Sequence, residues 1–123
     1  MNYIIGCDAH KHYSQFAVYE GDNLRGKQVR VEHERGAIRE FLSEFPDGTS
    51  VALESIGNWY WIVEEIEQAG CKALLAHPAK AKVMMGNVNK TDKLDARGLA
   101  TLLRNGTLPT VWIAPSAVRD ERE

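Results

Sequence analysis

The sequence predicts a mixed α/β fold in which a five-stranded sheet carries helices on both faces. Residues 2–8 are almost continuously apolar, as expected of a strand buried on both faces. A hairpin pattern follows, and after it strand-like and helix-like segments alternate. With 123 residues, 44% hydrophobic and 26% charged, the chain suits one soluble globular domain.

The N-terminal half is predicted to hold three antiparallel strands and one helix. Residues 14–20 form the second strand, residues 21–23 supply a turn, and residues 24–31 form the third strand. Apolar residues recur at helical spacing over residues 34–45, and the Pro-Asp-Gly sequence at 46–48 ends that helix.

The C-terminal half is predicted as strand, helix, strand and two further helices. The strands are residues 50–54 and 72–76, and the helix between them covers residues 59–69. A short helix over residues 78–84 and a last helix over residues 91–104 complete the order.

This order of elements is the ribonuclease H-like arrangement, in which the first strand is central and the fourth lies beside it and parallel. We assign residues 1–108 to this domain. The tail over residues 109–123 contains prolines and a charged end, which indicates a linker toward a further domain.

Four acidic residues stand where this arrangement would bring them together. Asp8 ends the apolar run of the first strand, and Glu54 ends the fourth strand. Asp92 and Asp95 lie three residues apart at the start of the last helix, so their carboxylates are expected on one helix face. Carboxylate oxygens are the ligands that Mg²⁺ prefers, and Mn²⁺ is an alternative. Two such ions about 4 Å apart can stabilise both oxygens of a phosphodiester displacement.

Each acid also has a structural interpretation that stays open. Asp92 and Asp95 can stabilise a helix start, where the macrodipole favours negative charge. Asp8 can be a turn residue, and Glu54 a solvated acid at a strand end. The structural interpretation requires four separate coincidences, so the metal site is the stronger prediction.

The charge distribution points to a phosphate backbone as the neighbour of these acids. The formal net charge is −2, yet residues 72–104 hold seven basic and two acidic residues, against eight and fifteen elsewhere. Lys90, Lys93 and Arg97 flank the acid pair and are candidate phosphate contacts, as is Lys11. A solvated helical face explains the charge distribution equally well.

Several other residues favour structural roles. His10 and His12 are weak metal-ligand candidates, and His77 is interpreted as a capping or core residue. The aromatic cluster at 59–61 has the spacing of a core-facing helix, with stacking on unpaired bases as the alternative.

Cysteine use and hydropathy indicate a reduced, cytoplasmic protein. Cys7 and Cys71 lack the spacing of metal ligands and are predicted to be free thiols. No secretion signal is recognisable, and no apolar run approaches the roughly 20 residues needed to cross a bilayer.

Three motifs resemble those of the Piv/MooV-like insertion-sequence transposases: Gly-Cys-Asp-Ala-His-Lys at 6–11, Glu-Ser-Ile-Gly-Asn-Trp-Tyr at 54–60 and Thr-Asp-Lys-Leu-Asp-Ala at 91–96. The resemblance implies a RuvC-like N-terminal catalytic domain that cleaves and transfers DNA strands. It further implies an element-encoded guide RNA and a homo-oligomer in the full-length protein. The implied Mg²⁺-binding, catalytic tetrad is Asp8, Glu54, Asp92 and Asp95.

One departure from the family bears on activity. Members continue into a C-terminal domain with a nucleophilic serine, whereas the only serine of the tail, Ser116, lies outside such a motif. The domain is therefore expected to be incomplete for recombination by itself.

Two other functions compete with the transposase interpretation. One is a non-catalytic assembly or nucleic-acid-binding module that keeps the fold after truncation. The other is a sugar-kinase-like or actin-like ATPase, which also begins with an Asp-ended strand and a hairpin. The bulky residues at 9–12 disfavour it, because that fold needs a small turn to admit phosphates.

Overall fold

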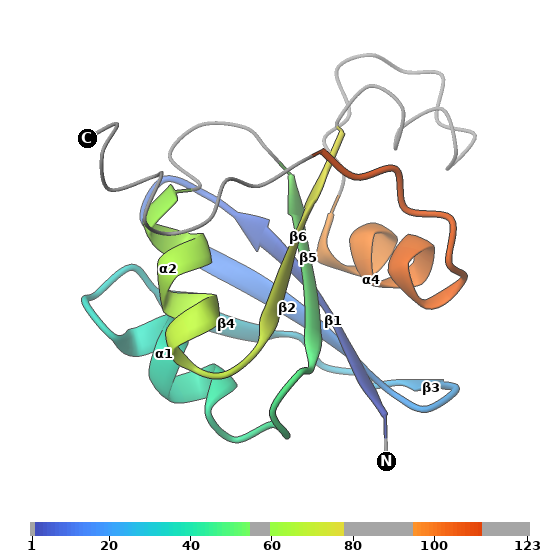
Figure 1. Ribbon diagram of the computed structural model, residues 1–123. Helices are drawn as coiled ribbons and strands as arrows, with labels where there is room; N and C mark the ends of the chain where they lie inside the picture. The colour runs from blue at the N-terminus through green and yellow to red at the C-terminus, as the bar shows by residue number, and fades with distance from the viewer. Residues whose placement is uncertain (1, 55–59, 78–94, 112–123) are drawn as a thin grey trace.

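The computed structural model describes residues 2–54, 60–77 and 95–111. Within these ranges it shows a six-stranded mixed sheet between two layers of helix. Helices α1 (Ala37–Leu42) and α2 (Tyr60–Gln68) cover one face, and α4 (Ala96–Arg104) covers the other (Figure 1). The predicted placement of helices on both faces is confirmed.

The sheet has the order β3-β2-β1-β5-β6, and β4 also pairs with β2. Strand β1 is central, antiparallel to β2 and parallel to β5, which is in turn parallel to β6. This confirms the predicted pairing of the first strand with the strand at 50–54. The strands are β1 (Tyr3–Ala9), β2 (Tyr13–Glu20), β3 (Asn23–Leu24), β4 (Val29–Glu32), β5 (Ser50–Glu54) and β6 (Lys72–Ala76).

The predicted third strand over residues 24–31 is wrong as one element, because β3 and β4 are separate and both pair with β2. The interruption begins at Arg25, whose guanidinium lies over the rings of Tyr3 and Phe45, 5.9 and 5.6 Å from their centroids. The backbone N–H of Arg25 still donates to the carbonyl oxygen of Val18 on β2 at 2.9 Å, so the strand is interrupted between Arg25 and the start of β4 at Val29. With β3 and β4 separate, the sheet has six strands rather than the predicted five.

Helix α1 is shorter than the predicted 34–45, because Gly36 begins it in a left-handed conformation with φ of 80°. The buried carboxylate of Glu65 accepts the backbone N–H groups of Gly36 and Arg39 at 2.8 and 3.1 Å. That side chain from α2 therefore satisfies the start of α1 and joins the two helices. Helix α2 and strand β6 agree with prediction, and the predicted helix at 78–84 lies outside the described residues.

The two faces of the sheet bury side chains of different size. The α1/α2 face holds the main core, which includes Ile5, Phe16 and Leu53. The α4 face is lined by Ala17, Ala52 and Ala76, with Gly6 among them at the centre of the sheet.

At Gly6 the backbone of α4 approaches the backbone of β1 closely. A Cβ atom at Gly6 would lie 2.0 Å from the carbonyl oxygen of Ala96 and 2.7 Å from the amide nitrogen of Ala100. A glycine inside a strand commonly marks such a close approach of backbones. The first turn of α4 therefore sits against the centre of β1, two residues before Asp8.

Candidate metal centre

The structure brings Asp8 and Glu54 together. Strands β1 and β5 are parallel, and Cys7 opposite Leu53 is the last pair in their register. Asp8 and Glu54 are the next residues on each strand, and their side chains share the face of Gly6 and Ala52. Their exposed fractions are 9% and 7%. Two buried carboxylates therefore stand side by side on the α4 face of the sheet.

Asp8 is held by a side chain that the sequence interpretation assigned no such role. The Oδ2 atom of Asp8 lies 3.0 Å from Nε2 of His10. The imidazole of His10 stacks on the ring of Tyr13, with centroids 4.6 Å apart and planes 19° apart. The Asp-x-His spacing at a strand end was the available signal, since residues i and i+2 of an extended chain share one side.

Asp95 is placed differently from the prediction. Helix α4 begins at Ala96, and Asp95 is its N-cap, with extended backbone at φ −87° and ψ 174°. The Oδ1 atom of Asp95 accepts the backbone N–H of Gly98 at 2.7 Å. The prediction that Asp95 lies inside the last helix is therefore wrong, whereas its shared face with Asp92 stays a prediction, because Asp92 is outside the described residues. The physical reason is that a short acceptor side chain satisfies the first free amides of a helix best from the cap position.

Helix α4, which Asp95 caps, lies on the same face of the sheet as Asp8 and Glu54. Figure 1 shows α4 on the side of the sheet opposite α1 and α2. The first turn of α4 packs on Gly6, and Asp8 follows on the same face of β1. Asp92, the fourth acid, lies outside the described residues.

Within the described ranges, no group of three or more His, Cys, Asp or Glu side chains is arranged to hold a metal. Two of the candidate phosphate contacts, Lys11 and Arg97, are exposed, three residues after Asp8 and two after Asp95. The other two, Lys90 and Lys93, lie outside the described part of the chain.

A second histidine secures the hairpin that carries Lys11. The Oγ atom of Ser14 lies 2.8 Å from Nε2 of His33, and Nδ1 of His33 lies 3.3 Å from the carbonyl oxygen of Lys11. The His33 ring also meets Trp61 edge-on at 4.8 Å. Burial lowers the pKa of His33 below its ordinary value of 6.5. In its neutral form this imidazole donates from Nδ1 to the carbonyl oxygen of Lys11 and accepts at Nε2 from the Ser14 hydroxyl.

The predicted structural roles of several residues can be compared with the structure. Trp61 packs against the main core, which confirms that side chain's assignment, whereas Trp59 lies outside the described residues. Cys7 and Cys71 are buried free thiols, as predicted, and burial raises the pKa of Cys71. The backbone N–H of His77 donates to the carbonyl oxygen of Pro109.

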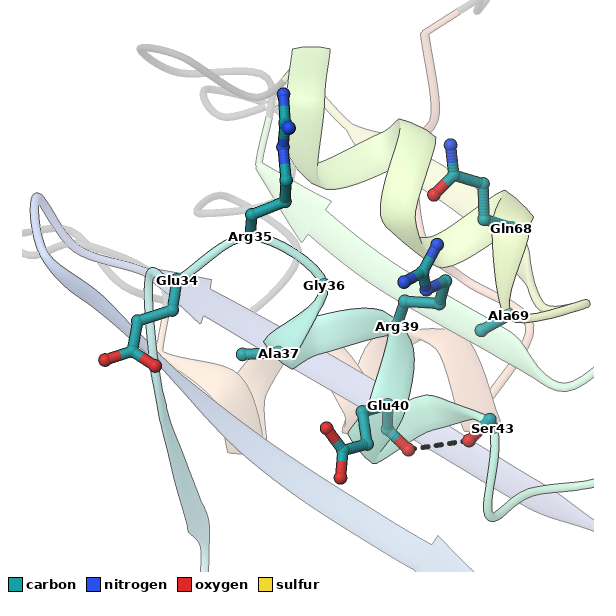
Figure 2. A pocket seen from close by; sticks show the side chains of 9 residues that line it. All are labelled: Glu34, Arg35, Gly36, Ala37, Arg39, Glu40, Ser43, Gln68 and Ala69. Atoms are coloured by element: carbon teal, nitrogen blue, oxygen red, sulfur yellow. Dashed lines mark hydrogen bonds between the residues drawn. The ribbon is translucent and has the colours of Figure 1, made fainter.

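A hollow of about 490 Å³ lies on the opposite side of the sheet, between α1 and the end of α2 (Figure 2). Figure 2 shows Arg35, Arg39 and Gln68 on one side of it and the carboxylates of Glu34 and Glu40 on the other. Two cations and two anions give this lining no net charge, unlike a site for a polyanion. The hollow is also separate from the acids, which lie on the α4 face. Its lining residues are Glu34, Arg35, Gly36, Ala37, Arg39, Glu40, Ser43, Gln68 and Ala69.

The fold and the acids at one end of its sheet are accompanied by a clear family relationship. The chain is a transposase domain, since a family model described as "Transposase" matches residues 5–121. It belongs to the family of that model, the DEDD transposases of the IS110 type. The family predicted from the three motifs is thereby confirmed. No curated protein sequence matches the chain. Among the described helices, none is long and apolar enough to cross a membrane.

Proposed function

We propose that this domain is the catalytic part of a DNA transposase and cleaves and transfers DNA strands with a divalent metal ion, Mg²⁺ or Mn²⁺. The observation that carries the proposal is the pair Asp8 and Glu54, buried at adjacent register positions of two parallel strands. The strand order, with an antiparallel hairpin beside a parallel pair, supports a ribonuclease H-like, RuvC-like fold. The full proposed site is Asp8, Glu54, Asp92 and Asp95.

The donor set suits a hard cation. All four side chains offer carboxylate oxygens, and Mg²⁺ binds oxygen ligands in preference to nitrogen or sulfur. Asp8 and Glu54 are buried like-charged neighbours, and a bound cation would offset both their repulsion and their loss of hydration. When bound, the metal neutralises charge that develops on the attacking and leaving oxygens of the phosphodiester.

In this proposal, the fold contributes by fixing the relative positions of the acidic side chains. Asp8 and Glu54 stand on hydrogen-bonded strands, so their separation is set by the sheet rather than by a loop. Asp95 is tied to the start of α4 through Gly98, and α4 is seated on Gly6. We expect these three side chains to hold their relative places when the substrate arrives.

The proposed DNA contacts are the exposed cations beside the acids. Lys11 and Arg97 would contact phosphates on either side of the carboxylates, and we assign Lys90 and Lys93 the same role. Association with an element-encoded guide RNA and self-association of the full-length protein are proposed on the family relationship alone.

One observation favours the alternative of a non-catalytic assembly or nucleic-acid-binding module. The Asp95 carboxylate already serves α4 as a cap, a role it can hold without any metal. The two functions differ in what they predict for metal binding, because only the catalytic site needs the acids to share an ion.

Metal-dependent thermal stability tests the proposal. At a metal concentration about a hundred times its Kd, binding stabilises the folded state by about 2.7 kcal/mol. We expect Mg²⁺ and Mn²⁺ to raise the melting temperature of the wild type, and Asp8→Asn or Glu54→Gln to abolish the rise. Glu40→Gln, which alters an exposed acid on α1, is the matched control and should respond as the wild type does. A folded wild type that ignores both metals would refute the metal site and favour the non-catalytic module.

A further inference from the structure

We propose that His10 is a positioning residue that orients the Asp8 carboxylate for metal binding. The inference rests on the proposed function, because it assigns Asp8 a metal to bind. Its basis is the contact of 3.0 Å between Nε2 of His10 and Oδ2 of Asp8.

The direction of this hydrogen bond follows from its partners. An ionised carboxylate can only accept, so His10 donates its Nε2–H to Asp8. The last torsion of an aspartate side chain is broad, and its carboxylate plane turns easily when nothing holds it. A bond to one oxygen at a buried position restrains that rotation and so directs the second oxygen, Oδ1. Ligating carboxylates in metalloproteins are commonly held in this way by hydrogen bonds from their neighbours.

His10 is itself held on two sides. Its backbone N–H donates to the carbonyl oxygen of Tyr13 at 2.8 Å, and its ring lies on the Tyr13 ring. The guanidinium of Arg30 lies over the Tyr13 ring, 3.7 Å from the centroid, and Nε of Arg30 donates to Glu32 at 2.6 Å. A stack that runs from β4 through Tyr13 to the imidazole therefore sets the plane in which His10 can donate.

His12 provides the internal comparison. It lies in the same hairpin and is exposed, and its carbonyl oxygen accepts the backbone N–H of His33. Replacing its imidazole therefore removes a histidine of the hairpin without touching the bond to Asp8.

The experiment measures Mn²⁺ binding to the full chain by titration, with the melting temperature in metal-free buffer recorded for each variant. His10→Phe keeps a flat ring for Tyr13 to stack on but removes the donor. We expect His10→Phe to weaken Mn²⁺ binding about 10- to 100-fold, as loss of such neighbours typically does. His10→Gln, which can still donate, should recover part of the affinity, and His12→Phe should match the wild type.

The outcomes separate this inference from the proposed function. A folded wild type that binds no Mn²⁺ refutes the metal site itself. A wild type that binds, together with His10→Phe of equal or higher affinity, refutes only the positioning role; higher affinity would show that His10 competes with the metal for Asp8. If His10→Phe does not fold, Tyr13→Leu serves instead, since it removes the stacking and leaves the donor. A Tyr13→Leu affinity equal to that of the wild type would also overturn the inference, and a several-fold loss would support it.

Discussion

The two faces of the sheet are built from alternate residues of the same strands, yet they differ in what they can tolerate. On the α1/α2 face, Ile5, Phe16 and Leu53 interdigitate with helix side chains. On the α4 face, Gly6 and Ala52 leave the helix almost in contact with the strand backbone.

The two faces therefore contribute differently: one supplies most of the stability of the fold, and the other sets the position of α4. Large side chains bury more apolar area, at roughly 25 cal/mol for each Å², so the α1/α2 face supplies most of the hydrophobic stabilisation. Small residues bury little apolar area but allow α4 to lie close against the strand backbone. Because α4 carries Asp95 and faces Asp8 and Glu54, the face with the smaller core determines the geometry of the proposed site.

The largest expected effect is that of Gly6→Ala. The new Cβ would meet the backbone of Ala96 and Ala100, which cannot rotate away as a side chain would. We expect a loss of about 4 kcal/mol or more in unfolding free energy, measured by urea denaturation, together with displacement of α4. Gly26→Ala is the matched control, because nothing lies within 4 Å of a Cβ there. Equal stability of the two variants would show that α4 does not need this close approach.

The second largest expected effect is that of Leu53→Ala. Leu53 follows Ala52 in β5, and its side chain lies on the α1/α2 face of the sheet. Leu53 is fully buried, and its truncation leaves a cavity under α1 and α2. The expected loss is about 3 kcal/mol in the same denaturation experiment. In contrast to Gly6→Ala, we expect folded Leu53→Ala protein, at temperatures below its melting temperature, to bind Mn²⁺ as the wild type does. Loss of that response in a folded Leu53→Ala protein would contradict the division of roles between the two faces.

The smallest expected effect is a pH dependence through His33. Burial lowers the pKa of this imidazole in the folded state, so the unfolded chain takes up the proton first as the pH falls. Stability from the neutral His33 is therefore fully present above the unfolded pKa of about 6.5 and is lost as the pH falls from there toward the folded pKa. The unfolding free energy, measured by denaturation at pH values between about 7.5 and about 5, should decline as the pH falls. His33→Gln should make this decline less steep. An unchanged slope in His33→Gln would assign the decline to other groups.

How far the sequence determined this protein can be judged from individual elements. Strand β6 and helix α2 were predictable, because periodicity and turn residues are local signals. The pairing of β1 with the strand at 50–54 was predicted from the order of the elements along the chain. The motifs at 6–11, 54–60 and 91–96 were sufficient to name the family, which the match over residues 5–121 confirms.

Two features escaped the sequence interpretation because each depends on residues far apart in the chain. At the interruption, the Arg25 guanidinium lies over the distant Phe45 ring, and the start of the short α1 is held by Glu65 on α2. Local propensity carries no information on such partners, so strand and helix lengths were overestimated.

The sequence by itself determined the family, the alternation of apolar and polar residues in the strands, and the four acids that we propose as a metal site. Only the tertiary structure decided that Asp95 is the cap of α4, that His10 donates to Asp8, and that Gly6 is where helix and sheet meet. The physical reason is the distance along the chain between the residues that interact. Hydropathy and turn chemistry act between near neighbours in the chain, whereas the direction in which a carboxylate points is set by whatever group the fold brings within about 3 Å of it.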